Sequence, residues 1–319
     1  MKINLNEAAE ILKNNDGFTI LTHRSPDGDT IGSAYALCMA LRQMGKKARV
    51  LCSDPIPAKY GYFTDKVSMD KNFEEHFVVS TDVADVKLFG KGLAEYANKV
   101  QLCLDHHETN TDFAEKTCVD PHACAAAELI ERLLKCMDIF IDKDIANALY
   151  TGICTDSGCF RYSNTTAETH RIAAELIEYG ADYADINRLM FETKSRSRMD
   201  LERRVIESMQ FYADGKIVVA FVTEEMLAQS GIDRNDTDGL ASLPKLIEGV
   251  KVAITINERI GEKFKISIRT SDDVSASSIC ERMGGGGHRA AAGCALDGTL
   301  KEVTERIVAE SLRELERTV

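Results

Sequence analysis

The chain lacks the long apolar segments of a membrane protein. No apolar run in its 319 residues approaches the ~20 residues that a transmembrane helix needs. The first seven residues also lack the apolar core of a signal peptide and lead into an amphipathic helical pattern. The sequence therefore predicts a cytoplasmic protein that has no membrane partner.

The cysteine patterns of zinc ribbons and disulfide scaffolds are missing too. The ten cysteines are scattered, mostly within apolar segments, and no Cys-x-x-Cys pair occurs. In a reducing cytosol such residues behave as small hydrophobic side chains. The cysteines therefore predict neither a structural zinc site nor a disulfide framework.

Positive charge is scarce. The chain has 39 Lys and Arg against 51 Asp and Glu, which gives a net charge of −12. Long duplex nucleic acid binds through a broad positive surface, so this charge balance argues against such a partner. Small phosphorylated substrates remain compatible, because a metal cluster and a few arginines can offset the overall charge.

The composition is that of a globular protein, with 44% hydrophobic and 28% charged residues, and the length predicts two domains. In residues 1–191, strand and helix patterns alternate, which predicts an α/β domain built on a doubly wound, mostly parallel sheet. Residues 192–208 are strongly charged and predict an exposed helical linker that can act as a hinge. Residues 209–319 predict a smaller α/β domain, in which 250–256 and 263–269 form a hairpin.

The most informative stretch is Gln101–Leu104, which is followed by Asp105, His106 and His107. An apolar strand that ends in an acid and two imidazoles is typical of the carboxyl end of a central parallel strand. Ligands bind at that edge in open α/β sheets. The stretch therefore predicts a functional site at this edge.

Other segments bring acids or histidine to the same predicted edge, namely His23, Asp27, Asp29, Asp82 and Asp156. Carboxylates gathered so densely would repel one another unless cations neutralised them. A set of Asp and His ligands without cysteine suits Mn²⁺ or a similar divalent ion. Two such ions about 3.5–4 Å apart, bridged by one Asp and a hydroxide, suit the hydrolysis of phosphoesters.

Three of these acids also have a purely structural explanation. Asp27 and Asp29 are good turn formers and helix caps, and Asp82 could cap its strand. Asp85 competes with Asp82 for the place at the strand end. These explanations leave the position of His23 at the end of a strand unexplained.

Taken together, the motifs resemble those of the DHH phosphoesterase superfamily. They are His-x₃-Asp-x-Asp from His23, the lone Asp82, Asp-His-His from Asp105, and Gly-Ile-x-x-Asp-Ser-Gly-x-Phe around Asp156. The run GGGGHRAAAG at 284–293 resembles the glycine-rich signature of the DHH-associated substrate domain. Length and motif order are similar to the branch of bacterial nano-RNases and pAp phosphatases.

The resemblance implies two Mn²⁺ ions, with Mg²⁺ or Co²⁺ as substitutes. The first ion would be held by His23, Asp27 and Asp82, and the second by Asp29, Asp82, His106 and Asp156, with Asp82 bridging. As catalytic residues, Asp105 would orient a ligand histidine, and His107 would stabilise charge on the scissile phosphate or protonate the leaving oxygen.

In the second domain, the resemblance implies a site for the terminal phosphate of the substrate. Gly285, Gly286, Gly287 and His288 would bind it as a glycine loop that opens a helix, with Arg269 as a further contact. A merely flexible loop and an exposed strand-end arginine are the structural alternatives.

The implied function is hydrolysis of oligoribonucleotides of two to five nucleotides and dephosphorylation of 3′-phosphoadenosine 5′-phosphate (pAp). By analogy with the family, the chain is also expected to form a homodimer. Two other functions stay open: a phosphodiesterase for cyclic or linear dinucleotides, and a nucleotide sensor without catalytic activity.

Overall fold

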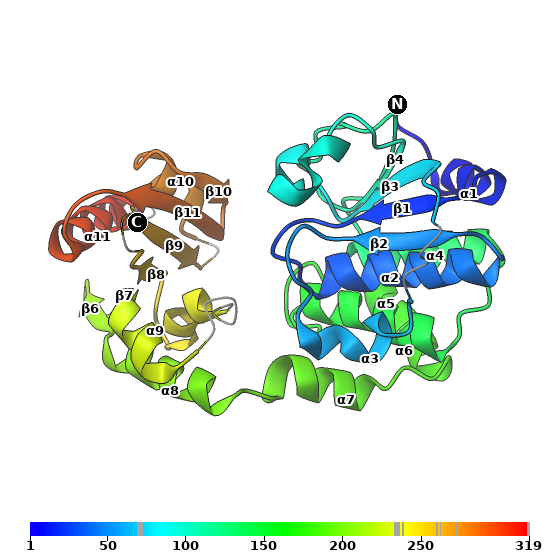
Figure 1. Ribbon diagram of the computed structural model, residues 1–319. Coiled ribbons are helices and arrows are strands. Elements are labelled where there is room, and N and C mark those ends of the chain that lie inside the picture. Colours follow the sequence, from blue (N-terminus) through cyan, green and yellow to red (C-terminus); the bar gives the residue numbers. More distant parts are fainter. Residues whose placement is uncertain are drawn as a thin grey trace. The chain divides into compact units, whose positions relative to one another are not determined.

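The computed structural model describes residues 1–68, 73–232, 237, 239–259, 261, 263–271 and 273–317. The chain divides into two compact units, Met1–Thr193 and Lys194–Val319 (Figure 1). Within the described residues, no helix combines the length and the apolar character that crossing a membrane requires.

The first unit is built on a five-stranded sheet with the order β2-β1-β3-β4-β5, in which every neighbouring pair is parallel. Its strands are β1 (Phe18–Leu21), β2 (Ala48–Leu51), β3 (Phe77–Thr81), β4 (Leu102–Asp105) and β5 (Lys116–Val119). The predicted α/β class with a parallel sheet is confirmed. The short edge strand β5 was not predicted, because its four residues mix polar and apolar types without a clear pattern.

Helices cover one face of this sheet and shorter segments cover the other (Figure 1). The helices of this unit are α1 (Leu5–Asn14), α2 (Gly28–Gln43), α3 (Gly61–Thr64), α4 (Ala126–Cys136), α5 (Lys143–Asp156), α6 (Ala167–Glu178) and α7 (Tyr183–Asn187), with the 3₁₀ turn η1 (Ala58–Tyr60) and the π-helical turn η4 (Arg188–Glu192). Helices α2 and α4 contact the strands, α5 packs against both of them, and α6 and α7 pack against α5. Alternate strand residues explain the two faces. Ile20 packs in the core beneath α2, α4 and α5, whereas Leu21 packs in the opposite core with Phe89 and Leu93.

The sequence of residues 86–98, between strands β3 and β4, predicts a single helix, and the structure differs from this prediction. The structure has two 3₁₀ segments there, η2 (Val86–Phe89) and η3 (Lys91–Tyr96). Gly90 separates them with a φ of 72°, a left-handed conformation that interrupts helical hydrogen bonding.

The second unit contains a six-stranded sheet with the order β10-β11-β9-β8-β7-β6. Its strands are β6 (Gln210–Tyr212), β7 (Ile217–Val222), β8 (Val252–Asn257), β9 (Phe264–Thr270), β10 (Gly286–His288) and β11 (Ala291–Leu296), and its helices are α8 (Arg196–Glu207), α9 (Glu224–Ser230), η6 (Leu240–Leu246), α10 (Ala276–Glu281) and α11 (Leu300–Glu316). Strands β8 and β9 pair antiparallel, as the hairpin pattern predicts. Residues 260 and 262 of the predicted turn lie outside the described residues.

Helix α8 occupies most of the segment that was predicted as an exposed linker. Its residues Leu201 and Val205 are fully buried and form a small core with strand β7, helix α9 and Leu240. One turn of a helix separates the two, so they lie on one face. Charged residues surround Leu201 and Val205 in the sequence, so this apolar face is difficult to recognise there. In the structure, α8 is part of the second unit.

The glycine run was expected to open a helix, and this expectation is wrong. It follows helix α10 and forms strand β10, which pairs antiparallel with β11. A Cβ added to Gly285 would lie 2.2 Å from the carbonyl oxygen of Gly293, so a side chain there would push the two chain segments apart. The run is therefore part of a tight hairpin.

Candidate metal centre

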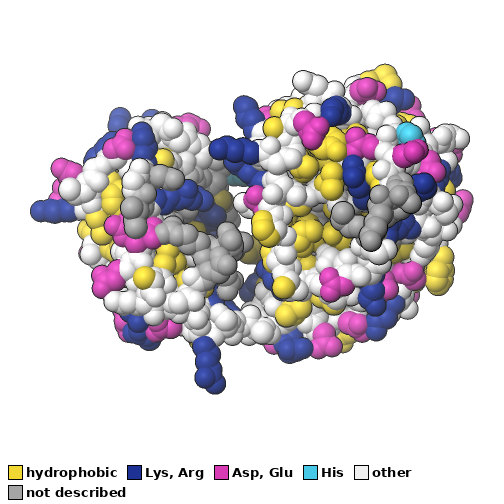
Figure 2. All heavy atoms as spheres, viewed as in Figure 1, with side chains coloured by type: hydrophobic (Ala, Val, Ile, Leu, Met, Phe, Trp, Pro, Cys, Tyr) yellow, Lys and Arg dark blue, Asp and Glu magenta, His cyan; other side chains and the backbone are white. Residues whose placement is uncertain are grey.

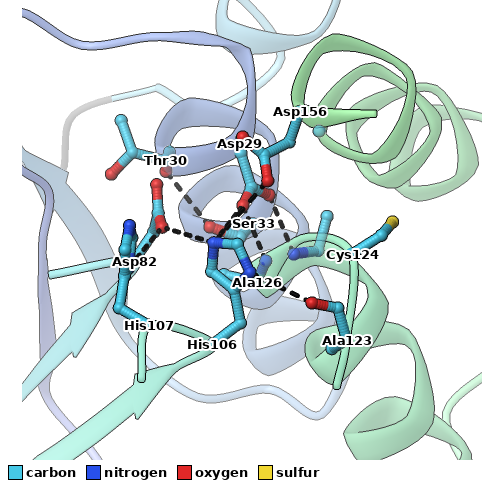
Figure 3. A network of polar contacts seen from close by, with 12 residues as sticks. Asp29, Thr30, Ser33, Asp82, His106, His107, Ala123, Cys124, Ala126 and Asp156 are labelled. Atoms are coloured by element: carbon cyan, nitrogen blue, oxygen red, sulfur yellow. Dashed lines mark hydrogen bonds and ion pairs between the residues drawn. The ribbon is translucent and has the colours of Figure 1, made fainter. Parts of the chain in front are cut away.

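The acids and histidines singled out in the sequence of the first unit come together at one edge of its sheet. Figure 3 shows five of them, Asp29, Asp82, His106, His107 and Asp156. His23 follows strand β1, Asp82 follows β3, and Asp105 ends β4, just before His106 and His107. These positions are the carboxyl ends of neighbouring parallel strands. The other residues are supplied by helices: Asp27 caps α2, Asp29 lies in its first turn, and Asp156 is the last residue of α5.

Asp82 lies at the centre of the group. Its Oδ2 is 3.4 Å from Nε2 of His23, and its Oδ1 is 3.5 Å from Nε2 of His106. The residue has a φ of 58°, in the left-handed region that Asp tolerates better than most residues. Such a conformation at a site is a form of stored strain. The two oxygens of one carboxylate thus face two different histidines.

Backbone carbonyls set the orientation of both histidines. Nδ1 of His23 lies 2.8 Å from the carbonyl oxygen of Arg24, and Nδ1 of His106 lies 3.2 Å from that of Ala123. A carbonyl accepts a hydrogen bond, so each Nδ1 carries a proton and each Nε2 points toward the acids, where it can bind a metal ion once it has lost its own proton. This tautomer is the one that a metal-ligating histidine needs.

Asp29 is fixed by the start of helix α4. Its carboxylate accepts hydrogen bonds from the backbone N–H groups of Ala126 (2.6 Å) and Ala127 (2.9 Å). The capping residue of α4, Ala125, has no side chain for this purpose, so Asp29 caps the helix from a distant part of the sequence. A Cβ on Gly152 would lie 2.8 Å from Oδ1 of Asp29, which explains the glycine at that position of α5.

Asp105 is fully buried and holds His107. Its Oδ1 lies 2.7 Å from Nδ1 of His107 and accepts the backbone N–H of His106, while its Oδ2 accepts the side-chain amide of Asn110 at 2.6 Å. Asp105 therefore contacts the Nδ1 side of the His107 ring and not its Nε2. Sequence reasoning missed Asn110, because nothing in the motif marks an asparagine three residues after His107.

The crowded acids and imidazoles perturb one another strongly. Burial raises the pKa of Asp29 well above its usual value, and the carboxylates of Asp82 and Asp156 raise it further. Burial also raises the pKa of Asp156 to about 6, with Asp82 and Asp27 adding to the effect. Burial alone would lower the pKa of His106, but the surrounding acids raise it to about 10. The site therefore favours bound positive charge.

The donor set fits divalent cations. Three groups of side chains each converge within 4.8 Å: Asp82 with His106 and His107, His23 with Asp27 and Asp82, and Asp29 with His106 and Asp156. Two ligand atoms that each lie ~2.1 Å from an ion are ~3.0–3.5 Å apart at the usual angles. The separations between histidine nitrogens and carboxylate oxygens in these groups, 3.4–3.8 Å, are close to that spacing. Oδ1 of Asp82 is buried and has no hydrogen-bond partner among the described residues, which suits an atom that ligates a metal.

Asp85, the competitor of Asp82, has another contact. Its Oδ1 accepts the backbone N–H of Lys87 at 2.8 Å and caps the η2 turn. It belongs to none of the three converging groups. The geometry therefore favours Asp82 at the centre.

In the second unit, two of the predicted substrate-binding residues lie in one row of the sheet. Arg269 on β9 is directly opposite Ala291 on β11, which is directly opposite His288 on β10. Residues opposite each other point to the same face, and two strand spacings put them roughly 9–10 Å apart. Only the small side chain of Ala291 stands between them.

Both units of this chain match models of known protein families. The model of the DHH family, N-terminal domain, matches residues 17–153, and that of the DHHA1 domain matches residues 214–317. A bifunctional oligoribonuclease and PAP phosphatase, NrnA, from Thermus thermophilus is 35% identical over 315 residues, which cover 96% of this chain and 92% of that protein. The cyclic-di-AMP phosphodiesterase PdeA of Listeria monocytogenes is 25% identical and covers 94% of this chain, but only 48% of its own length is matched.

Among solved structures, an exopolyphosphatase-related protein from Bacteroides fragilis matches with a TM-score of 0.89 at 25% identity, covering 98% of this chain and 97% of that one. The fold and the cluster of acids and histidines define a metal-dependent hydrolase that acts on phosphoester bonds. The chain belongs to the DHH family, with a DHHA1 domain in its second unit.

Proposed function

We propose that this chain hydrolyses oligoribonucleotides of two to five nucleotides and dephosphorylates pAp, with two Mn²⁺ ions as cofactors. The relative from Thermus thermophilus is named for both activities and matches nearly the whole chain. The observation that carries the proposal is the position of Asp82, whose two oxygens face His23 and His106 separately. A carboxylate in that position suits a bridge between two cations.

The donor set supports manganese. One ion would be held by His23, Asp27 and Asp82, and the other by Asp29, Asp82, His106 and Asp156. These ligands are carboxylates and imidazoles without thiolates, a combination that suits Mn²⁺, with Mg²⁺ or Co²⁺ as substitutes. When bound, the ions would activate water and stabilise charge on the phosphate oxygens.

His107 and Asp105 would act on the leaving group. Asp105 holds the proton of His107 on Nδ1, at 2.7 Å, so that Nε2 is the atom offered to the substrate. Because Asp105 and Asp82 both lie near the ring, they raise the pKa of His107 against the opposing effect of burial. A protonated His107 would stabilise charge on the phosphate or donate a proton to the leaving oxygen.

The second unit would bind the far end of the substrate. Arg269 and His288, in one row across three strands, are the proposed contacts to its terminal phosphate, with the backbone of Gly285–Gly287 beside them. Arginine suits phosphate because its planar guanidinium can make two hydrogen bonds to the oxygens.

The surface charge supports short substrates. On the face drawn in Figure 2, acidic and basic side chains are interspersed and form no broad basic surface of the kind that long nucleic acid needs. All ten cysteines are free, which suits a reducing compartment and supports the cytoplasmic location that the sequence predicts.

A direct assay tests the proposal. The metal-stripped protein is incubated with a 5′-labelled RNA dinucleotide, a long RNA and pAp, each with and without Mn²⁺. We expect Mn²⁺-dependent turnover of the dinucleotide and pAp and weak cleavage of the long RNA. If neither the dinucleotide nor pAp is turned over, the proposal is wrong.

Two matched variants show whether the metal centre is responsible. Asp82→Asn keeps the shape of the side chain but removes the negative charge that the two proposed metal sites share. It should abolish turnover of both the dinucleotide and pAp. Asp85→Asn makes the same chemical change three residues away, at a helical cap, and it should retain both.

The relative PdeA supports one alternative, a phosphodiesterase for cyclic di-AMP or its linear product. The same assay with these two dinucleotides separates the functions. Turnover of cyclic di-AMP well above that of the RNA dinucleotide would favour the alternative. Mn²⁺ binding without turnover of any substrate would favour a nucleotide sensor.

A further inference from the structure

A small cavity lies beside His107 and has no role in the function proposed above. Its volume is about 150 Å³, and His107 forms part of its wall. The remaining wall comes from the loop after β4, from strand β5 and from the N-terminal segment. All of these belong to the first unit.

The N-terminal segment is held in place at this cavity. Lys2 forms a parallel bridge with Thr117 of β5, and the backbone N–H of Ile3 donates to the carbonyl oxygen of Thr117 at 3.0 Å. The segment thus extends the sheet beyond its edge strand. One side of the cavity is therefore formed by hydrogen-bonded backbone.

The cavity and the metal centre share His107. Nδ1 of this residue lies 3.6 Å from Oδ1 of Asp82, at the centre of the cluster, while the same side chain lines the cavity. A phosphodiester held at the cluster would therefore have one of its two ester arms next to the cavity.

The charges around the cavity disfavour a phosphate. Glu108 and Asp112 contribute two carboxylates, and Lys2, whose Nζ is 3.7 Å from Asp112, contributes one ammonium group. A neutral group that donates hydrogen bonds, such as a nucleobase or a ribose, suits such a wall better. Thr117 adds a buried hydroxyl that has no hydrogen-bond partner among the described residues.

The size limits the ligand further. A volume of 150 Å³ equals about five water molecules of the liquid and is well below the ~300–1,000 Å³ of pockets for drug-sized ligands. It suits one base or one ribose and is too small for a dinucleotide.

We propose that this cavity is a subsite for the base or the ribose of the second nucleoside of an oligoribonucleotide, the nucleoside on the far side of the scissile phosphate. The inference rests on the proposed function. It has a consequence for specificity: a dinucleotide has a nucleoside to place in the cavity, whereas pAp has only one nucleoside in all. The subsite would therefore raise the affinity for RNA and leave that for pAp unchanged.

The test is a variant that fills the cavity. Val119 lines it, is half-buried and belongs to none of the hydrophobic core clusters. Val119→Phe adds bulk at a strand position that accepts aromatic residues. We expect KM for the RNA dinucleotide to rise roughly tenfold, while kcat and KM for pAp stay within about twofold of the wild type.

A second variant covers the case in which Val119→Phe fails to fold. Thr117→Val keeps the shape of the side chain, and loss of a hydroxyl without a protein partner should not lower stability. It should raise KM for the dinucleotide about threefold, again without an effect on pAp. Thr255→Val is the matched control, because Thr255 also has a buried, unpartnered hydroxyl but lies on β8 of the second unit.

The outcomes separate the two proposals. Suppose that the wild-type protein turns over both substrates. The subsite alone would then be overturned if the cavity variants left both KM values unchanged, or changed KM for the dinucleotide and for pAp by the same factor. Absence of wild-type turnover of both substrates would overturn the proposed function, and the subsite with it.

Discussion

Replacement of Asp156 by asparagine should stabilise the metal-free protein. The pKa of this carboxyl rises from its usual 3.8 to about 6, chiefly because it is buried, and also because Asp82 and Asp27 lie near it. The ionised form is therefore disfavoured in the native state. Asparagine has a similar shape and no charge, so the variant removes this cost.

The magnitude follows from the size of the pKa rise. A rise of about two pH units, at about 1.4 kcal/mol each, corresponds to ~3 kcal/mol. Since 34% of the side chain is exposed, solvent screening lowers this to about 1–2 kcal/mol. For a unit of this size, the melting temperature should increase by roughly 2–8 °C.

The pH dependence gives the prediction its sign. The unfolded chain releases this proton near pH 3.8, but the native protein keeps it until about pH 6. Between these values the native state binds more protons, so wild-type stability falls as the pH rises. The advantage of Asp156→Asn should therefore be absent near pH 4, grow up to about pH 6, and stay constant above it.

Thermal unfolding of the metal-stripped proteins between pH 4 and pH 8 measures this advantage. Asp138→Asn is the matched control, because Asp138 is exposed and has a φ of 58°, which asparagine tolerates. It should show no pH-dependent gain. Added Mn²⁺ should reverse the order of the two melting temperatures, because the variant loses one of the proposed metal ligands. A variant that is no more stable than the wild type at pH 8 without metal would refute the electrostatic reasoning.

Three further predictions concern metal removal and two structural contacts. A chelator should lower the melting temperature of a protein prepared with Mn²⁺, because a ligand at 100 times its Kd stabilises the native state by about 2.7 kcal/mol. An unchanged melting temperature would count against a metal centre. Asn110→Ala removes the 2.6 Å hydrogen bond to the carboxylate of Asp105, which holds His107. The variant should lower kcat roughly 10–100-fold, while its Mn²⁺ affinity, measured by calorimetry, stays unchanged. An equal loss of Mn²⁺ affinity would contradict a role limited to His107. Arg282→Ala breaks ion pairs to Glu310 (2.5 Å) and Glu314 (2.8 Å) that join α10 to α11, and it should destabilise the second unit by about 1–3 kcal/mol in urea. The exposed Arg313→Ala, at 3.9 Å from Glu310, is its control and should change stability by less than about 0.5 kcal/mol.

Strand positions in the first unit could be predicted because a strand that is buried on both faces appears in the sequence as a continuous apolar run. The strands β1, β3 and β4 are runs of buried residues that end abruptly in His23, Asp82 and Asp105. In a parallel sheet, such ends share one edge. Local pattern was therefore enough for the fold class and for most of the cluster.

Local pattern failed where long-range contacts decide the structure. The charged sequence of α8 predicts an exposed linker, but Leu201 and Val205 find a core in the second unit. The glycine run allows a loop as well as a strand, and only its pairing with β11 selects the strand. In both cases, tertiary packing overrides a weak local preference.

The sequence by itself determined which chemical groups the site contains, because the motifs place acids and histidines at strand ends and at the start of a helix. Only the tertiary structure decided how these groups act on one another. Asp29 caps α4, across roughly a hundred residues of sequence, and Asn110 completes the hydrogen bonds of Asp105. Asp82 faces two histidines from two other strands. Such contacts depend on distances between side chains remote in sequence, which exist only once the sheet has formed and its helices have packed against it.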